Sequence, residues 1–187
     1  MLGNGKQLIG YITVETRENY FRGAALVTDP RGIPADFRYT DPVRPTKLER
    51  ILYGGALDIY LREEVILENL LNAIEAKPSL WLVEEDELIV PVQKTSRLPV
   101  IAIQQTQRSP LEQSGHYEPT GERGVFIFQA DNISAPLRLT VSEENISQIA
   151  QFAQNLAQTA ENMELLEPFS RMSKAIEAVE AEQQNAR

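Results

Sequence analysis

The pattern of hydrophobic and polar positions predicts a sheet of short strands interrupted by one long helix. Runs rich in β-branched and aromatic side chains are bounded by proline, glycine and acidic residues, which is typical of strands. We interpret as strands residues 8–15, 20–28, 35–40, 79–84, 87–94, 98–106, 124–130 and 136–141. Asp29-Pro30-Arg31-Gly32 lies between the second and third runs, and its proline and glycine suit a tight chain reversal.

Helical spacing of apolar residues predicts a long helix over residues 46–76. Thr46 and Glu49 fit a capping box at its start, in which each side chain bonds the backbone N–H of the other residue. Gly54-Gly55 interrupts the apolar stripe, and we interpret the pair as a break or kink because glycine is unfavourable inside helices. Residues 142–187 repeat the helical spacing, and Pro168 divides them into two helices.

These patterns together predict an α+β protein. We expect a mainly antiparallel sheet of about six to eight strands, with the long central helix and two C-terminal helices packed on one face. Residues 1–141 would form the α+β domain, and residues 142–187 a C-terminal helical unit packed on the same domain, with a frayed tail near the end. Residues 107–123 are polar, lack periodicity and are expected to form a long loop.

Composition and charge narrow the function. The 187 residues include no cysteine, which excludes disulfides and thiolate metal sites, and one histidine cannot form a zinc site. No apolar run approaches the roughly 18–20 residues of a membrane helix, so we expect no membrane association. The lack of cysteine favours a cytoplasmic location. The formal charge of −9 disfavours nucleic acid as a partner. Nucleic acid would then have to bind through a local basic patch. No cofactor or metal is predicted.

A local basic cluster is the main candidate site. Residues 31–50 hold five basic residues against three acidic ones, next to a proline-spaced segment and a helix start where anions are favoured. The guanidinium group of arginine matches phosphate and carboxylate geometry. The predicted binding residues are Arg38, Tyr39, Arg44, Lys47, Arg50, Tyr53 and Gly54. The alternative is that the arginines are solvated or paired within the protein and that Gly54 marks a plain helix boundary.

No phosphate-loop, dinucleotide-binding, zinc-protease or nucleophile-elbow pattern is present, so we predict no catalytic residue and favour no enzymatic role. We therefore expect a non-enzymatic, cytoplasmic binding or regulatory protein that acts through a protein partner or as a homodimer. The amphipathic C-terminal helices would supply the interaction surface, unless they cover the protein's own sheet. The alternative is anion binding, of a nucleotide or a nucleic-acid phosphate, or an enzymatic role at a basic corner around residues 38–55.

Overall fold

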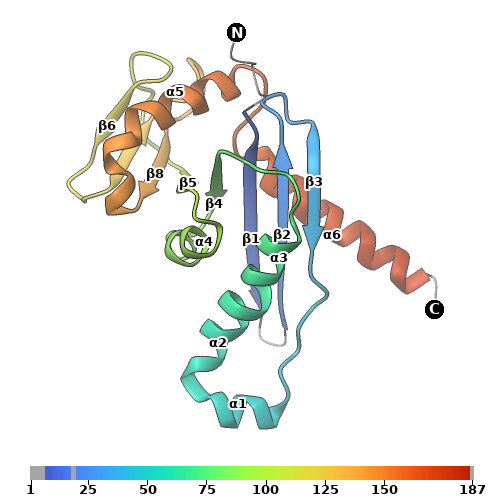
Figure 1. Cartoon of the computed structure of the whole chain (residues 1–187). Helices are drawn as coiled ribbons and strands as arrows, with labels where there is room; N and C mark the ends of the chain where they lie inside the picture. Colours follow the sequence, from blue (N-terminus) through green and yellow to red (C-terminus); the bar gives the residue numbers. More distant parts are fainter. Residues whose placement is uncertain (1–6, 18–19, 186–187) are drawn as a thin grey trace.

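One eight-stranded sheet forms the centre of the protein (Figure 1). The computed structural model describes residues 7–17 and 20–185. The order of the strands across the sheet is β3-β2-β1-β4-β5-β8-β7-β6. Their bounds are β1 Ile9–Arg17, β2 Tyr20–Thr28, β3 Pro34–Tyr39, β4 Leu80–Val83, β5 Val100–Gln105, β6 Tyr117–Pro119, β7 Val125–Phe128 and β8 Leu137–Val141. The predicted fold class is confirmed, because the protein is α+β and most strand pairs are antiparallel.

The turn between β2 and β3 forms as predicted. The backbone N–H of Gly32 donates to the carbonyl of Asp29 at 2.9 Å, and Gly32 has a φ of +79°. The Asp29 carboxylate accepts from the backbone N–H of Arg31 at 2.9 Å and of Ile33 at 3.1 Å. Glycine at the positive φ and an aspartate that bonds the turn's own backbone are the features expected of a tight reversal.

The three central strands, β1, β4 and β5, are parallel to one another. Parallel neighbours need long crossover connections, which the helices supply. The helices are α1 Lys47–Tyr53, α2 Leu57–Tyr60, α3 Glu68–Ala73, α4 Ile89–Ser96, α5 Ile149–Ala160 and α6 Glu167–Asn185. A 3₁₀ turn, Gly54–Ala56, separates α1 from α2, and a π-helical stretch, Leu61–Leu67, joins α2 to α3, so the predicted 46–76 helix is interrupted at Gly54.

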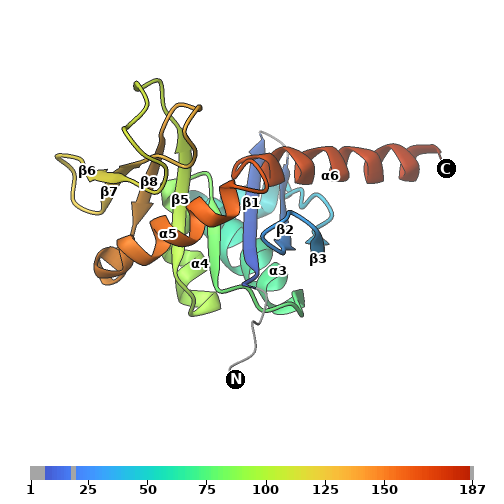
Figure 2. The same ribbon diagram turned by 90° about the horizontal axis from the view of Figure 1, so that it is seen from above.

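The helices cover both faces of the sheet, which corrects the prediction that they share one. Tyr11, Leu82 and Ile103 point toward α5 and α6, whereas Ile12 and Val83 point toward α2, α3 and α4. Figure 2 shows α6 on one side of β1 and β2 and α3 on the other. The cause is that β4 and β5 are apolar on both faces, so each face needs its own layer of helices. The apolar faces of α5 and α6 therefore pack on the protein's own sheet.

The strand predicted at residues 87–94 is wrong. A 3₁₀ turn, Asp86–Leu88, leads there into α4. Pro91 lies in the first turn of α4, where a missing N–H costs no hydrogen bond. The predicted loop at 107–123 contains the short strand β6. Helix α6 extends through most of the expected frayed tail, of which residues 186–187 lie outside the described residues.

Within residues 7–17 and 20–185, no helix combines the length and the apolar character needed to cross a membrane.

Candidate functional site

The structure separates the predicted basic residues into two groups. Arg38 lies on β3, where its guanidinium pairs with Asp36 at 3.1 Å and Glu75 at 3.5 Å. The Asp36 carboxylate also accepts from the backbone N–H of Glu75 at 2.7 Å and of Ala76 at 3.2 Å. This network ties β3 to the segment after α3. Tyr39 follows on the same strand and packs its ring 5.8 Å from that of Phe37.

The segment after β3 is held against β2 by backbone hydrogen bonds. Val43 and Phe21 exchange two of them, at 2.8 and 2.9 Å, and Thr40 donates to the carbonyl of Gly23 at 2.9 Å. Arg44 follows directly, with its guanidinium carbon 5.7 Å from the centroid of the Tyr20 ring. Arg44 itself is exposed. The connection therefore holds an exposed arginine in a fixed place instead of leaving it on a mobile loop.

Helix α1 begins with the predicted capping box. Thr46 Oγ1 accepts from the backbone N–H of Glu49 at 3.2 Å, and Glu49 Oε2 accepts from the backbone N–H of Thr46 at 2.6 Å. The helix ends at Gly54, whose φ is +52° and whose surroundings leave room for a side chain. No residue of α1 is buried. Figure 1 shows the helix beyond the end of the sheet, and we call residues 42–56, which contain it, the arm.

The arm exposes apolar and basic side chains together. Leu48, Ile51 and Leu52 are 63%, 67% and 71% exposed, and Lys47 and Arg50 are exposed on the same helix. Tyr53, which is 42% exposed, stacks on Tyr60 with ring centroids 4.9 Å apart. Large apolar side chains at this density on a surface mark a contact site more often than a solvated face. Five of the seven predicted residues, Arg44, Lys47, Arg50, Tyr53 and Gly54, thus lie on the arm.

A groove lies at the carboxyl ends of β4 and β5, where the sequence predicts no site. It encloses about 620 Å³ and is lined by Glu84, Gln104 and Gln105 beside α6. Partial burial raises the pKa of Glu84, and the carboxylate of neighbouring Glu85 raises it further. The carboxyl ends of parallel strands are a common ligand position in α/β sheets. The sequence does not reveal this groove, because the parallel pairing of β4 and β5 is not predicted from it.

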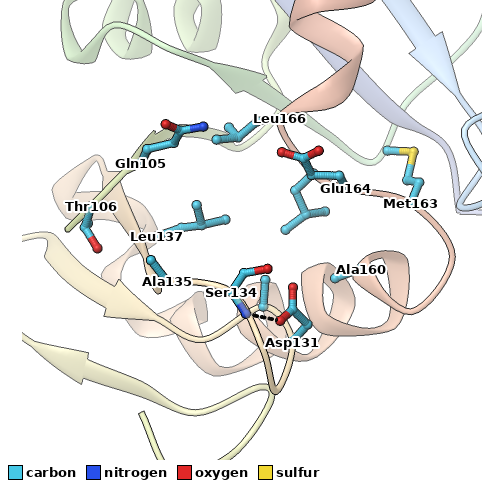
Figure 3. A pocket seen from close by; sticks show the side chains of 12 residues that line it. Gln105, Thr106, Asp131, Ser134, Ala135, Leu137, Ala160, Met163, Glu164 and Leu166 are labelled. Carbon is cyan, nitrogen blue, oxygen red and sulfur yellow. Dashed lines mark hydrogen bonds between the residues drawn. The ribbon is translucent and has the colours of Figure 1, made fainter. Parts of the chain in front are cut away.

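A second pocket of about 420 Å³ adjoins this groove and shares Gln105, Glu164 and Leu166 with it. Figure 3 shows Asp131 and Ser134 on one side of the pocket and Gln105 and Glu164 on the other. Across the described ranges, 7–17 and 20–185, no three histidine, aspartate or glutamate side chains are grouped so that they could hold a metal ion.

Comparisons with known proteins identify the fold. No protein-family model and no curated protein matches the sequence. Among solved structures, endonuclease V from Streptomyces avermitilis superposes with a TM-score of 0.63 at 15% identity, over 94% of this chain and 83% of that one. The enzyme from Bacillus subtilis superposes with a TM-score of 0.60 at 12% identity, over 97% of this chain and 83% of that one. A Ciona intestinalis endonuclease V, bound to DNA that contains an inosine, superposes with a TM-score of 0.52 at 10% identity. The match covers 80% of this chain and 76% of that one. The chain has the fold of these nucleases.

This similarity overturns the predicted function. The expectation of a non-enzymatic regulatory protein that acts through a protein partner or a homodimer is wrong, because the structures that share the fold are nucleases. The expectation that nucleic acid is disfavoured as a partner is wrong for the same reason, since the Ciona intestinalis structure of this fold contains DNA. The net charge of −9 averages over the whole surface, whereas the arm is locally basic.

Proposed function

We propose that this protein binds nucleic acid through the arm, with a preference for strands whose bases are unpaired. The observation that carries the proposal is the presence of exposed cations and exposed apolar side chains on one capped helix. Arg44, Lys47 and Arg50 would contact phosphates, which supply most of the sequence-independent affinity for nucleic acid. Nucleases of the same fold support this assignment.

The apolar side chains favour a single strand over a duplex. The faces of stacked bases are inaccessible in a duplex, whereas an unpaired base can pack against an aromatic or aliphatic side chain. Ile51, Leu52 and Tyr53 would provide that surface, next to the cations that hold the backbone. Arg38 would serve mainly to fix β3, because Asp36 and Glu75 already pair with it. We further propose a cytoplasmic location, which the lack of cysteine supports.

The test is a fluorescence-anisotropy titration with labelled single-stranded DNA, single-stranded RNA and duplex DNA. We expect a single strand to bind more tightly than the duplex, and affinity to fall as salt increases. Ile51→Ser with Leu52→Ser should weaken single-strand binding severalfold. The matched control is Val90→Ser with Ile133→Ser, which removes two apolar side chains that are 70% and 90% exposed elsewhere. Equal losses in both double variants, or no binding of any strand, would contradict the proposal.

Strand cleavage is the second candidate function, and Glu84 is the observation that favours it. A carboxyl group with a raised pKa beside a groove is suited to proton transfer. Because the described residues hold no cluster of metal ligands, we derive no step through a metal. An end-labelled single strand, incubated with the protein and resolved by gel, tests the activity. Cleavage that is lost in Glu84→Gln would support this role, and an intact strand with the unmodified protein would refute it.

A further inference from the structure

The 420 Å³ pocket beside the groove has a chemistry that differs from that of the arm. It lies where the ends of β5 and β8 meet the connection between α5 and α6 (Figure 3). Its walls include the apolar side chains of Leu137, Met163, Leu165 and Leu166. Apolar walls combined with convergent polar groups are the usual form of a small-molecule site.

The loop at one wall of the pocket is held rigidly. Gln129 is fully buried, and its Nε2 donates to the backbone carbonyls of Asp131 at 2.6 Å and Ser134 at 2.8 Å. Its Oε1 accepts from the backbone N–H of Leu111 at 2.7 Å. Asp131 Oδ1 accepts from the backbone N–H groups of Ile133 at 2.7 Å and Ser134 at 2.6 Å. A wall fixed in this way loses little conformational entropy when a ligand binds.

The polar groups of the pocket are mainly hydrogen-bond acceptors. The backbone N–H groups of Ser134 and Ile133 lower the pKa of Asp131, so its carboxylate is charged at neutral pH. These two bonds use Oδ1, and the Ser134 side chain also bonds the carboxylate, whose Oδ2 keeps acceptor capacity for a ligand. Glu164 faces the pocket from the opposite wall, and its carboxylate has no hydrogen bond or ion pair with the part of the chain that is described. The lining contains no lysine, arginine or histidine to neutralise the two carboxylates.

We propose that this pocket binds a small organic cation, a primary ammonium group on a short apolar chain. The ammonium has three N–H donors, which suit Asp131 Oδ2, the Glu164 carboxylate and the Ser134 hydroxyl. The apolar chain would lie against Leu137 and Met163. A bare metal ion would gain nothing from the apolar walls, and an anion would be repelled by both carboxylates. The proposal is independent of nucleic-acid binding by the arm.

Calorimetric titration with hexylamine, 1-hexanol and hexanoate, in the absence of nucleic acid, tests the site. Hexylamine should bind, while the alcohol and the carboxylate of the same length should not. Asp131→Asn retains an Oδ1 for the two backbone N–H groups and replaces the charged Oδ2 acceptor with an uncharged NH₂ donor, and Glu164→Gln makes the same change on the opposite wall. Each should weaken hexylamine binding by about tenfold or more, as expected for a lost charged hydrogen bond.

Glu161→Gln provides the matched control, because Glu161 is exposed on the same connection but does not line the pocket. It should leave hexylamine binding unchanged. Three results would overturn the proposal: no heat of binding with hexylamine, equal binding of hexylamine and 1-hexanol, or affinity that is the same in Asp131→Asn, Glu164→Gln and the unmodified protein. A nucleoside such as cytidine that binds the pocket while hexylamine does not would likewise overturn it.

Discussion

The guanidinium carbon of Arg44 lies 5.7 Å from the centroid of the Tyr20 ring, so a side chain of the arm rests on a strand of the sheet. Arg22 approaches the same ring at 5.4 Å, and its guanidinium also pairs with Glu15 and Glu180. Tyr20 thus links the arm to a partly buried ion-pair network that joins β1, β2 and α6. A cation over an aromatic face is held with about 0.5–1 kcal/mol at an exposed site.

Replacing Tyr20 should therefore loosen Arg44 and weaken nucleic-acid binding. We expect Tyr20→Leu to reduce the affinity for a single strand by about two- to fivefold, the ratio that corresponds to the loss of one such interaction. Tyr20→Phe keeps the aromatic face and should bind as the unmodified protein does. Anisotropy titrations of both variants at one salt concentration provide the measurement. Equal affinities for Leu and Phe at this position would show that the ring does not position Arg44.

The capping box at Thr46 should control the local order of the arm and leave the rest of the fold unaffected. Loss of an N-cap costs about 1 kcal/mol of helix stability, and α1 has no buried side chain to compensate. We expect Thr46→Ala to increase amide hydrogen exchange in residues 47–53 severalfold, while the melting temperature stays nearly constant. Thr46→Ser retains the hydroxyl and should restore protection. A large fall in melting temperature with Thr46→Ala would mean that the arm packs against the core after all.

The close contact between Gly10 and Trp81 should make Gly10 intolerant of any side chain. A Cβ at Gly10 would lie 2.4 Å from Cε3 of the fully buried Trp81, between two central strands. Overpacking of this kind costs about 1–3 kcal/mol, so Gly10→Ala should lower the free energy of unfolding by that amount. Gly55→Ala is the matched control, because nothing lies within 4 Å of a Cβ there. Urea unfolding that gives the same free energy for both variants would contradict the packing described.

Asp36 should contribute stability that is lost in acid. Burial alone would raise the pKa of Asp36, but the backbone N–H groups of Glu75 and Ala76, together with Arg38, lower it below its ordinary value. A depressed pKa in the folded state adds stability above the unfolded value of about 3.9, and the gain disappears as the pH falls through the folded pKa.

Asp36→Asn should accordingly be less stable than the unmodified protein at pH 7, and the difference should shrink as the pH falls below about 4. Urea unfolding at several pH values measures it. Asp58→Asn serves as the control, because the Asp58 carboxylate has no hydrogen bond or ion pair among residues 7–17 and 20–185. A gap between Asp36→Asn and the unmodified protein that is constant with pH would show that the lost contacts are not those of the charged carboxylate.

Local features of the fold could be predicted from sequence because nearby residues determine them. The Asp29–Gly32 turn, the Thr46 capping box and the break at Gly54 all depend on residues within a few positions of one another. The strand proposed at residues 87–94 failed because the proline and β-branched residues of that stretch suit an edge strand as well as a first helical turn. Only the burial of Val92 and Leu88 against the sheet decides between them.

The same distinction between local and long-range features holds for the candidate site. The arm could be predicted from sequence because its binding residues are close together in the chain: Arg44, Lys47, Arg50 and Tyr53. The groove and its neighbouring pocket combine Glu84, Gln105, Asp131 and Glu164, which come from separate segments that only the sheet brings together. Short apolar runs such as those of β4 and β5 are typical of parallel strands buried on both faces, and that signal would have indicated helices on both sides.

The dependence of single-strand affinity on salt tests the central proposal most directly. A plot of log affinity against log salt falls by about 0.7 for each phosphate contact on a single strand. Arg44→Ala with Lys47→Ala should therefore flatten the slope by about 1.4 and weaken binding at every salt concentration. Lys94→Ala with Lys174→Ala, which removes two exposed lysines far from the arm in sequence, should leave the slope unchanged. A slope that is the same in the arm variant and in the unmodified protein would show that the arm does not bind the phosphates.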